Sequence, residues 1–139
     1  MEQTLILLKP DCIQRMLAGK VLDRFQSEGF VIRASKMVSL SKELLREHYA
    51  HLVTFDFYPP LEAFMLEAPV MALVLERENA VQHARTILGP TDSRKAEKGT
   101  IRGDFGTDNR RNIAHASDSP ENARTEVERF FPEGIDGGL

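Results

Sequence analysis

The sequence predicts an α+β fold of the ferredoxin-like, split βαβ kind, in which a four-stranded antiparallel sheet is covered by helices. Two observations support this class. Short apolar segments rich in β-branched residues are separated by segments with helical periodicity. The chain has 139 residues and no internal repeat, so we expect one domain spanning residues 1–139.

The first third of the chain predicts two strands around a helix. Residues Thr4–Leu8 (TLILL) are apolar and closed by a proline, which is typical of a buried strand. Asp11 and Gln14 resemble a capping box, and apolar residues then recur at helical spacing as far as Gly29. We therefore expect one helix, followed by a long second strand over residues 30–40.

The middle of the chain predicts helices around a third strand. Ser41 begins a helical stretch that we expect to break near Pro59-Pro60 and to resume over residues 61–66. The apolar run of residues 70–76 predicts a central strand. Residues 78–88 carry apolar side chains at helical spacing and predict a helix stopped by Gly-Pro.

The last third predicts a loop, a short strand and a helix. Residues 89–111 have little periodicity, several glycines and many charges, so we expect a long ordered loop, and such loops are usually functional. Residues 112–116 predict a short last strand. Ser119 and Pro120 are typical of a helix start, as N-cap and first helical residue.

Composition restricts the classes of function. Hydrophobic residues make up 42% of the chain, and no apolar run approaches the roughly 20 residues of a membrane span, so we expect no membrane partner. The N-terminus does not resemble a signal peptide, and the single Cys12 can form no internal disulfide, so we expect a cytoplasmic location. A net charge of −3 argues against nucleic-acid binding.

Positive charge is nevertheless concentrated before His115. This excess indicates a local anion site, and a solvated surface is the alternative. The cations are Arg85, Arg94, Lys95, Lys98, Arg102, Arg110 and Arg111.

Several short motifs do not carry a function on inspection. Residues 89–95 (GPTDSRK) lack the second glycine and the hydroxyl residue of a P-loop, and residues 104–106 (DFG) have none of the other kinase motifs. His48 and His51 have a spacing that could hold a metal, but no further ligand converges on them, so we expect a solvated helix face. The serine-hydrolase reading of His115, Ser117 and Asp118 fails because triad members come from separated segments.

The segment NIAHASDS (residues 112–119) places His115 between two alanines, which leave an imidazole approachable. A lone histidine is more often structural than catalytic. Neutral imidazole is, however, a competent nucleophile near pH 7, and arginines hold phosphoryl oxygens in a bidentate way. His115 is therefore a candidate for phosphoryl chemistry.

Over essentially its whole length the sequence resembles a nucleoside diphosphate kinase. The similar stretches are collinear, and NIAHASDS matches the family's N-x-x-H-[GA]-S-D signature. They are TLILLKPD, EHYAHL, PVMALVLE, GTIRGDFG and NIAHASDS.

The resemblance implies that His115 takes the γ-phosphoryl group of a nucleoside triphosphate such as ATP, forms a phosphohistidine, and passes the group to a nucleoside diphosphate by ping-pong kinetics. It implies that Glu126 and Ser117 orient the imidazole and that Tyr49 lies beside it. Glu126 lies two helical turns after Ser119, on the same face of the expected last helix.

The resemblance also implies the binding residues. It assigns the phosphates to Lys9, Arg85, Thr91 and Arg102, with Mg²⁺ bridging the phosphates and no protein ligand to the metal. Asn112 with Lys9 would contact the sugar hydroxyl. Phe57 would stack on the base, and stacking without edge recognition would give a broad base specificity. A core aromatic is the alternative for Phe57.

Some positions depart from the family pattern. Cys12 and Ala116 replace glycines, and Asn109 stands where the residue opposite Phe57 is usually apolar. Ser93 and Lys98 replace two loop prolines. The family implies a dimer-based homo-oligomer, a tetramer or a hexamer. A catalytically silent nucleotide-binding or protein-interaction module is the competing hypothesis, and it has no need of the nucleophile that this chain keeps.

Overall fold

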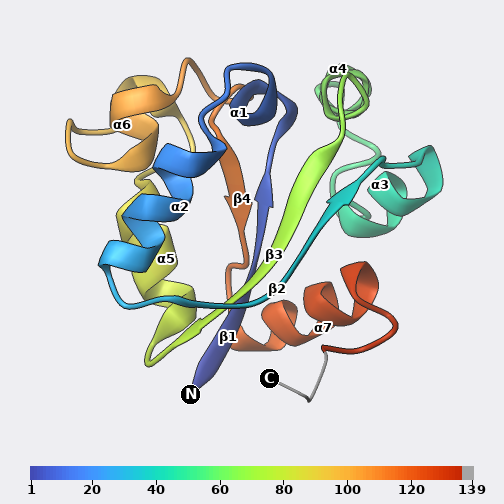
Figure 1. Cartoon of the computed structure of the whole chain (residues 1–139). Coiled ribbons are helices and arrows are strands. Elements are labelled where there is room, and N and C mark those ends of the chain that lie inside the picture. Colours follow the sequence, from blue (N-terminus) through green and yellow to red (C-terminus); the bar gives the residue numbers. More distant parts are fainter. Residues whose placement is uncertain (136–139) are drawn as a thin grey trace.

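The computed structural model describes residues 1–135 and has a four-stranded antiparallel sheet in the order β2-β3-β1-β4 (Figure 1). The strands are β1 (Glu2–Leu8), β2 (Val31–Val38), β3 (Val70–Arg77) and β4 (Ala114–Ala116). Because β3 lies between β1 and β2, the first two strands form the split βαβ unit that the sequence predicts. The predicted fold class is confirmed.

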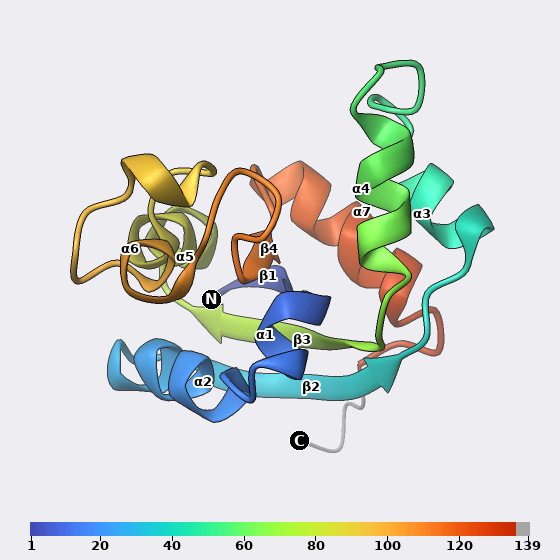
Figure 2. The same ribbon diagram turned by 90° about the horizontal axis from the view of Figure 1, so that it is seen from above.

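Helices lie along both faces and one end of this sheet (Figures 1 and 2). They are α1 (Pro10–Gln14), α2 (Ala18–Ser27), α3 (Lys42–His48), α4 (Tyr58–Met65), α5 (Ala80–Leu88), the 3₁₀ helix η1 (Ser93–Lys95), α6 (Ile101–Phe105) and α7 (Pro120–Phe130). Figure 2 shows α3 and α4 side by side, at the end of the sheet away from α2.

The core has a layer on each face of β1 because side chains alternate across a strand. Ile6 and Leu8 pack into the layer under α2 and α5, which includes Phe25. Leu5 and Leu7 pack on the other face with Phe130 of α7 and with Phe131, the residue that follows it. All four β1 side chains are fully buried, so β1 is the centre about which both layers form.

The single helix that we expect after the first strand is wrong, because α1 and α2 are separate. Met16 between them is 88% exposed and adopts φ 57°, a left-handed conformation that ends α1. The capping box is also wrong. The N-cap is Lys9, which makes no side-chain cap, and the Asp11 carboxylate instead accepts a hydrogen bond from the Ile113 N–H at 3.1 Å.

Two further boundaries differ from the sequence predictions. Pro59 and Pro60 do not break a helix but lie in the first turn of α4, where the missing proline N–H costs no hydrogen bond. The predicted loop of residues 89–111 contains η1 and α6, which begin at side-chain caps: Asp92 accepts from the Arg94 N–H at 3.1 Å, and Thr100 accepts from the Gly103 N–H at 3.0 Å.

The last helix has the predicted start. The Ser119 hydroxyl accepts a hydrogen bond from the Asn122 N–H at 3.1 Å, and Pro120 is the first helical residue. Within residues 1–135, no helix combines the length and the apolar character needed to cross a membrane.

Candidate active site

A cleft of about 1010 Å³ lies where the end of β1, β4 and α7 face α3 and the segment that follows it. Of the ten residues that the resemblance assigns to the site, nine line this cleft and Ser117 is buried behind it. The nine are Lys9, Tyr49, Phe57, Arg85, Thr91, Arg102, Asn112, His115 and Glu126.

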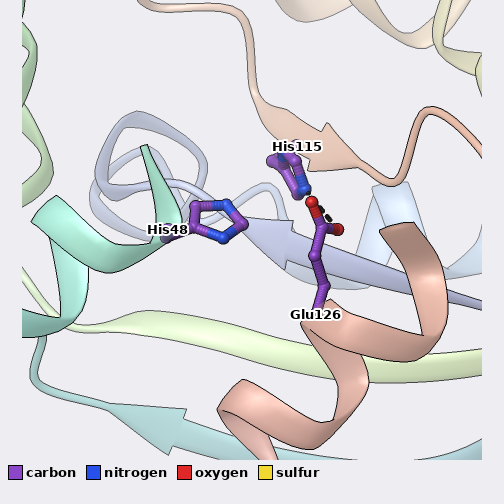
Figure 3. A group of neighbouring side chains, drawn as sticks. All are labelled: His48, His115 and Glu126. Carbon is purple, nitrogen blue, oxygen red and sulfur yellow. Dashed lines mark hydrogen bonds and ion pairs between the residues drawn. The ribbon is translucent and has the colours of Figure 1, made fainter. Parts of the chain in front are cut away.

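His115 is held from one side by a chain of hydrogen bonds (Figure 3). Its Nε2 lies 2.9 Å from Oε1 of Glu126, which also accepts a bond of 2.7 Å from the Ser117 hydroxyl. Ser117 Oγ in turn accepts from the Leu5 N–H at 3.1 Å, so strand β1 anchors the chain. Because Nε2 is engaged by Glu126, Nδ1 is the ring nitrogen that is left to react.

Glu126 is held in its charged form. Although burial opposes ionisation, the hydrogen bonds and charge of His115 and the hydrogen bond of Ser117 keep the pKa of Glu126 below its ordinary value. A carboxylate only accepts hydrogen bonds, so the neutral imidazole carries its proton on Nε2. The lone pair then resides on Nδ1 of His115.

Two residues before His115 the backbone makes a γ-turn. The Ala114 N–H bonds to the Asn112 carbonyl at 2.9 Å around Ile113, whose φ is 78°. This conformation is strained for a β-branched residue and persists only when the surroundings enforce it. Here the Ile113 N–H donates to Asp11 and the Ile113 carbonyl accepts from the Lys9 N–H at 2.9 Å.

Arg102 holds the same turn from the other side. Its Nε donates to the Asn112 carbonyl at 3.1 Å and its Nη2 to the Ala114 carbonyl at 2.6 Å. Nη1 donates to the Gly89 carbonyl at 3.0 Å. Burial and then the charge of Arg85 lower the pKa of Arg102 to about 10, so it stays cationic at neutral pH. Arg102 therefore brings positive charge to the cleft and also fixes the backbone beside His115.

Lys9 and Asn112 lie together, as the predicted contact to one sugar hydroxyl requires. Lys9 Nζ donates to Oδ1 of Asn112 at 2.8 Å, and the Asn112 amide donates to the carbonyls of Thr91 and Asn109 at 2.9 and 3.2 Å. Burial, and then the charge of Arg102, lowers the pKa of Lys9 to about 8. Lys9 is thus a buried cation at neutral pH.

The other assigned residues differ in exposure. Tyr49 is buried, and this burial raises the pKa of its hydroxyl. Phe57 is 48% exposed and stacks on Phe55 with ring centroids 5.3 Å apart, so it is not a core aromatic. Arg85 and Thr91 are exposed, which leaves them accessible to a ligand.

His48 contradicts the prediction of a solvated helix face, whereas His51 is exposed as expected. His48 is only 6% exposed, and its ring centroid lies 4.7 Å from that of His115. Its place three residues after the buried Leu45 puts it on the inner face of α3, and this spacing could have revealed it. Sequence reasoning also missed the role of Asp11.

Comparison with known proteins identifies the family. The family model described as nucleoside diphosphate kinase matches residues 2–135. The chain belongs to the nucleoside diphosphate kinase family. A nucleoside diphosphate kinase of Rhodopirellula baltica is 45% identical over 131 residues, which cover 94% of this chain and 86% of the relative. The enzyme of Pasteurella multocida is 46% identical over 132 residues, covering 95% of each chain.

Solved structures of the family have the same fold. The nucleoside diphosphate kinase of Encephalitozoon cuniculi matches with a TM-score of 0.95 and 37% identity, over 98% of this chain and 92% of that one. The Halobacterium salinarum enzyme, solved in complex with CDP, matches with a TM-score of 0.90 and 36% identity, over 94% and 87%. Nucleoside diphosphate kinases are phosphotransferases that bind nucleotides, so this chain is a member of an enzyme family.

The departures from the family pattern lie in different environments. Cys12 and Ala116 are buried in the core layer under α2, where small side chains fit. Asn109 is exposed and lines the cleft. Ser93 is buried at the start of η1, and Lys98 is exposed. None of these five changes removes a group that bonds His115 or Glu126.

Proposed function

We propose that this nucleoside diphosphate kinase works through a phosphohistidine on Nδ1 of His115, in two half-reactions that share one cleft. The observation that carries the proposal is the bond of 2.9 Å between Nε2 of His115 and Glu126. It leaves the lone pair of Nδ1 available in a cleft that is also lined by Lys9, Arg85 and Arg102. A fixed nucleophile among cations suits phosphoryl transfer.

In the first half-reaction the Nδ1 lone pair forms a bond to the γ-phosphorus of a nucleoside triphosphate. The bond from that phosphorus to the bridging oxygen breaks, and its electron pair leaves with the nucleoside diphosphate. The imidazole gains positive charge, which the Glu126 carboxylate stabilises. In the second half-reaction a terminal phosphate oxygen of another nucleoside diphosphate attacks the phosphorus, and the electron pair of the P–N bond returns to His115.

The cations have distinct tasks in this scheme. Arg85 and Thr91, both exposed, are free to move onto the phosphate oxygens. Lys9 and Arg102 are held by hydrogen bonds and supply charge in a fixed position. Fixed charge needs little reorganisation when the phosphoryl group moves, which is the main source of electrostatic catalysis. The Tyr49 ring packs against the His48 ring, and the His48 ring in turn packs against the ring of the nucleophile.

The carboxylates of the cleft already accept hydrogen bonds from the protein. Magnesium would therefore arrive bound to the phosphates of the nucleotide rather than be held by protein ligands. Asp108 accepts from the N–H groups of Arg110 and Arg111 at 2.9 and 2.8 Å, and Asp118 accepts from the Asn122 amide at 2.6 Å. Glu126 is engaged by His115. Magnesium bound to the phosphates would neutralise part of their charge, while this chain positions the phosphates around it.

The exposed ring of Phe57 supports stacking on the base. A stacked ring face attracts every base, so the site would accept purines and pyrimidines. The Lys9–Asn112 pair would meet the sugar hydroxyl through the polar groups that both present to the cleft. Broad base specificity follows because these contacts do not read the base edges.

The edge of the sheet supports a homo-oligomer. Among residues 1–135, strand β2 has one neighbouring strand, β3, and it carries the apolar residues Val31 and Met37, which are 50% and 51% exposed. A long edge strand with apolar side chains is usually covered. We expect light scattering to give a multiple of the chain mass, and Met37→Lys to lower it, whereas Met16→Lys, off the sheet, leaves it unchanged. A monomeric wild type would contradict this.

Incubation with γ-labelled ATP and magnesium tests the phosphohistidine. We expect label on the wild-type protein that is lost in acid and retained in alkali, because P–N bonds are acid-labile. His115→Ala should carry no such label. Wild-type protein without label, or His115→Ala with as much label as wild type, would refute the mechanism.

A further inference from the structure

The buried residue His48 has no task in the mechanism above, although it touches the nucleophile. It is the last residue of α3, and its ring lies against the rings of Tyr49, His115 and Phe130, with centroids 4.7, 4.7 and 5.2 Å away. A nitrogen of His48, a nitrogen of His115 and a carboxylate oxygen of Glu126 lie within 4.8 Å of one another. Figure 3 shows the His48 ring pointing toward the other two side chains.

Arg129 decides which nitrogen of His48 carries the proton. Its Nη1 lies 3.0 Å from Nδ1 of His48. A guanidinium can only donate hydrogen bonds, so Nδ1 must accept and the neutral ring carries its proton on Nε2. That Nε2 is buried and has no hydrogen-bond partner within residues 1–135. A buried donor without a partner is costly, which calls for an explanation in the chemistry of the site.

The ring stays neutral. Burial, and after it the charge of His115, lowers the pKa of His48 to about 3. The groups that act on this ring from the surrounding elements are His115 of β4, Glu126 and Arg129 of α7, and His51 after α3. Of these, Glu126 alone favours a protonated His48. A neutral ring with its proton on Nε2 offers no lone pair there, so the three groups do not form a metal site while Arg129 holds Nδ1.

We propose that His48 is a positioning residue for His115. Its neutral Nε2–H, which makes no hydrogen bond within residues 1–135, donates to the Glu126 carboxylate when the His115 ring becomes cationic and keeps that carboxylate directed at His115 without adding a charge beside the nucleophile. Arg129 holds His48 in that tautomer. Glu126 must stabilise the positive charge that the His115 ring gains when the P–N bond forms. A cationic donor at the position of His48 would oppose that charge. This inference rests on the proposed phosphohistidine mechanism.

The tautomer can be measured without any activity. In ¹⁵N-labelled protein, nitrogen shifts distinguish a protonated ring nitrogen from one with a lone pair. We expect His48 to have its proton on Nε2 and to stay neutral through pH 6. Arg129→Met should release this single tautomer. The control Glu47→Gln, which removes the other partner of Arg129 at 3.7 Å, should retain it.

Substitutions at His48 test its effect on the nucleophile. His48→Phe keeps an aromatic ring but removes the donor, and we expect phosphohistidine formation to slow about tenfold. The acid limb of the pH profile should move to lower pH, because a Glu126 carboxylate that is no longer kept directed at His115 stabilises the cationic imidazole less. His48→Gln keeps a neutral N–H donor and an acceptor for Arg129, and should restore both rate and profile.

Three results would overturn the proposal: a proton on Nδ1 of His48, a wild-type rate and pH profile in a folded His48→Phe, or a His48→Gln as impaired as His48→Phe. If His48→Phe does not fold, the wild-type tautomer and His48→Gln still decide. Absence of label on the wild type would refute the proposed function itself, whereas equal labelling of wild type and His48→Phe would refute only the role of His48.

Discussion

In the wall of the cleft formed by β1, β4 and α7, hydrogen bonds of 2.7 and 2.9 Å join Ser117 and His115 to Glu126. In the wall that follows α3, by contrast, Phe57 is 48% exposed and its ring stacks on Phe55, itself 52% exposed. The first wall holds its nucleophile by hydrogen bonds, and the second presents an open aromatic surface. Phosphoryl transfer requires reacting atoms placed within fractions of an ångström, whereas stacking on a base tolerates a loosely held ring.

The largest effect should come from the fixed wall. Arg102→Met removes the hydrogen bonds that the guanidinium donates to the carbonyls of Gly89, Asn112 and Ala114, and so releases the strained turn at Ile113. We expect the free energy of unfolding to fall by about 3 kcal/mol, the cost of buried polar groups that lose their partners. Labelling of His115 should fall by about 100-fold or more.

Urea unfolding and single-turnover labelling measure these two effects. Arg85→Met is the matched control, because Arg85 is exposed and makes no such backbone bonds within the described residues. It should weaken nucleotide binding and leave the stability within about 0.5 kcal/mol of wild type. Equal urea midpoints for wild type and Arg102→Met would show that the stability of the fold does not depend on the hydrogen bonds that Arg102 donates to the backbone beside His115.

A smaller effect is expected from the open wall. Phe57→Ala should raise the KM for nucleoside diphosphates about tenfold, because stacking contributes roughly 1–3 kcal/mol per base. The kcat and the stability should change little, since the side chain is half exposed and does not touch the nucleophile. Phe57→Tyr should keep the KM of wild type. A loss of kcat in Phe57→Ala would show instead that this ring helps to position the reacting groups.

The smallest effect concerns pH. With a pKa of about 8, Lys9 loses its charge as the pH rises through that value, so the affinity for ADP should fall between pH 7.5 and 9.5 by less than about tenfold. Lys9→Met should bind more weakly at pH 7.5 and show no such fall. Calorimetric titration at several pH values measures both, and a wild-type affinity that is independent of pH would contradict the assignment.

The lowered pKa of Lys9 can also be tested through the pH dependence of the free energy of unfolding. The pKa of Lys9 is about 8 when folded and about 10.5 when unfolded, so between these values the unfolded chain binds more protons. The contribution of Lys9 to the free energy of unfolding therefore rises with pH from about 8 to about 10.5. Lys9→Met should lack this rise in urea unfolding.

Much of the fold could be predicted because hydrophobic periodicity and caps are local signals. The strand predicted over residues 70–76, found as β3 (Val70–Arg77), and the Ser119 cap were predictable in this way. The break between α1 and α2 was not, because the left-handed conformation of Met16 has no signature in its residue type. The Asp11 cap failed for a different reason: the carboxylate bonds Ile113, which is 102 positions away in sequence.

For the site, part of the cation cluster could be predicted from nearness in sequence. Four of the seven cations line the cleft with His115, namely Arg85, Arg94, Arg102 and Arg110, whereas Lys95, Lys98 and Arg111 are not among its lining residues. The arrangement of Lys9 and Asn112 could not be derived locally, since their bond of 2.8 Å joins β1 to the segment before β4. His48 was misjudged because polarity alone suggests solvent, whereas its position after Leu45 puts it on the inner face. The tautomer of His48 depends on Arg129 and has no signal in the sequence.

Strand β4 pairs with β1 through three residues, and His115 lies opposite Leu7 between two alanines that face the other core layer. A one-residue insertion or deletion just before this strand would turn the imidazole into the layer under α2 and bring an alanine to the cleft. Such a chain would keep the histidine but break the N-x-x-H spacing of the signature, because the γ-turn begins at Asn112. Among relatives, the spacing between the γ-turn and the strand is therefore as strict a criterion of competence as the histidine itself.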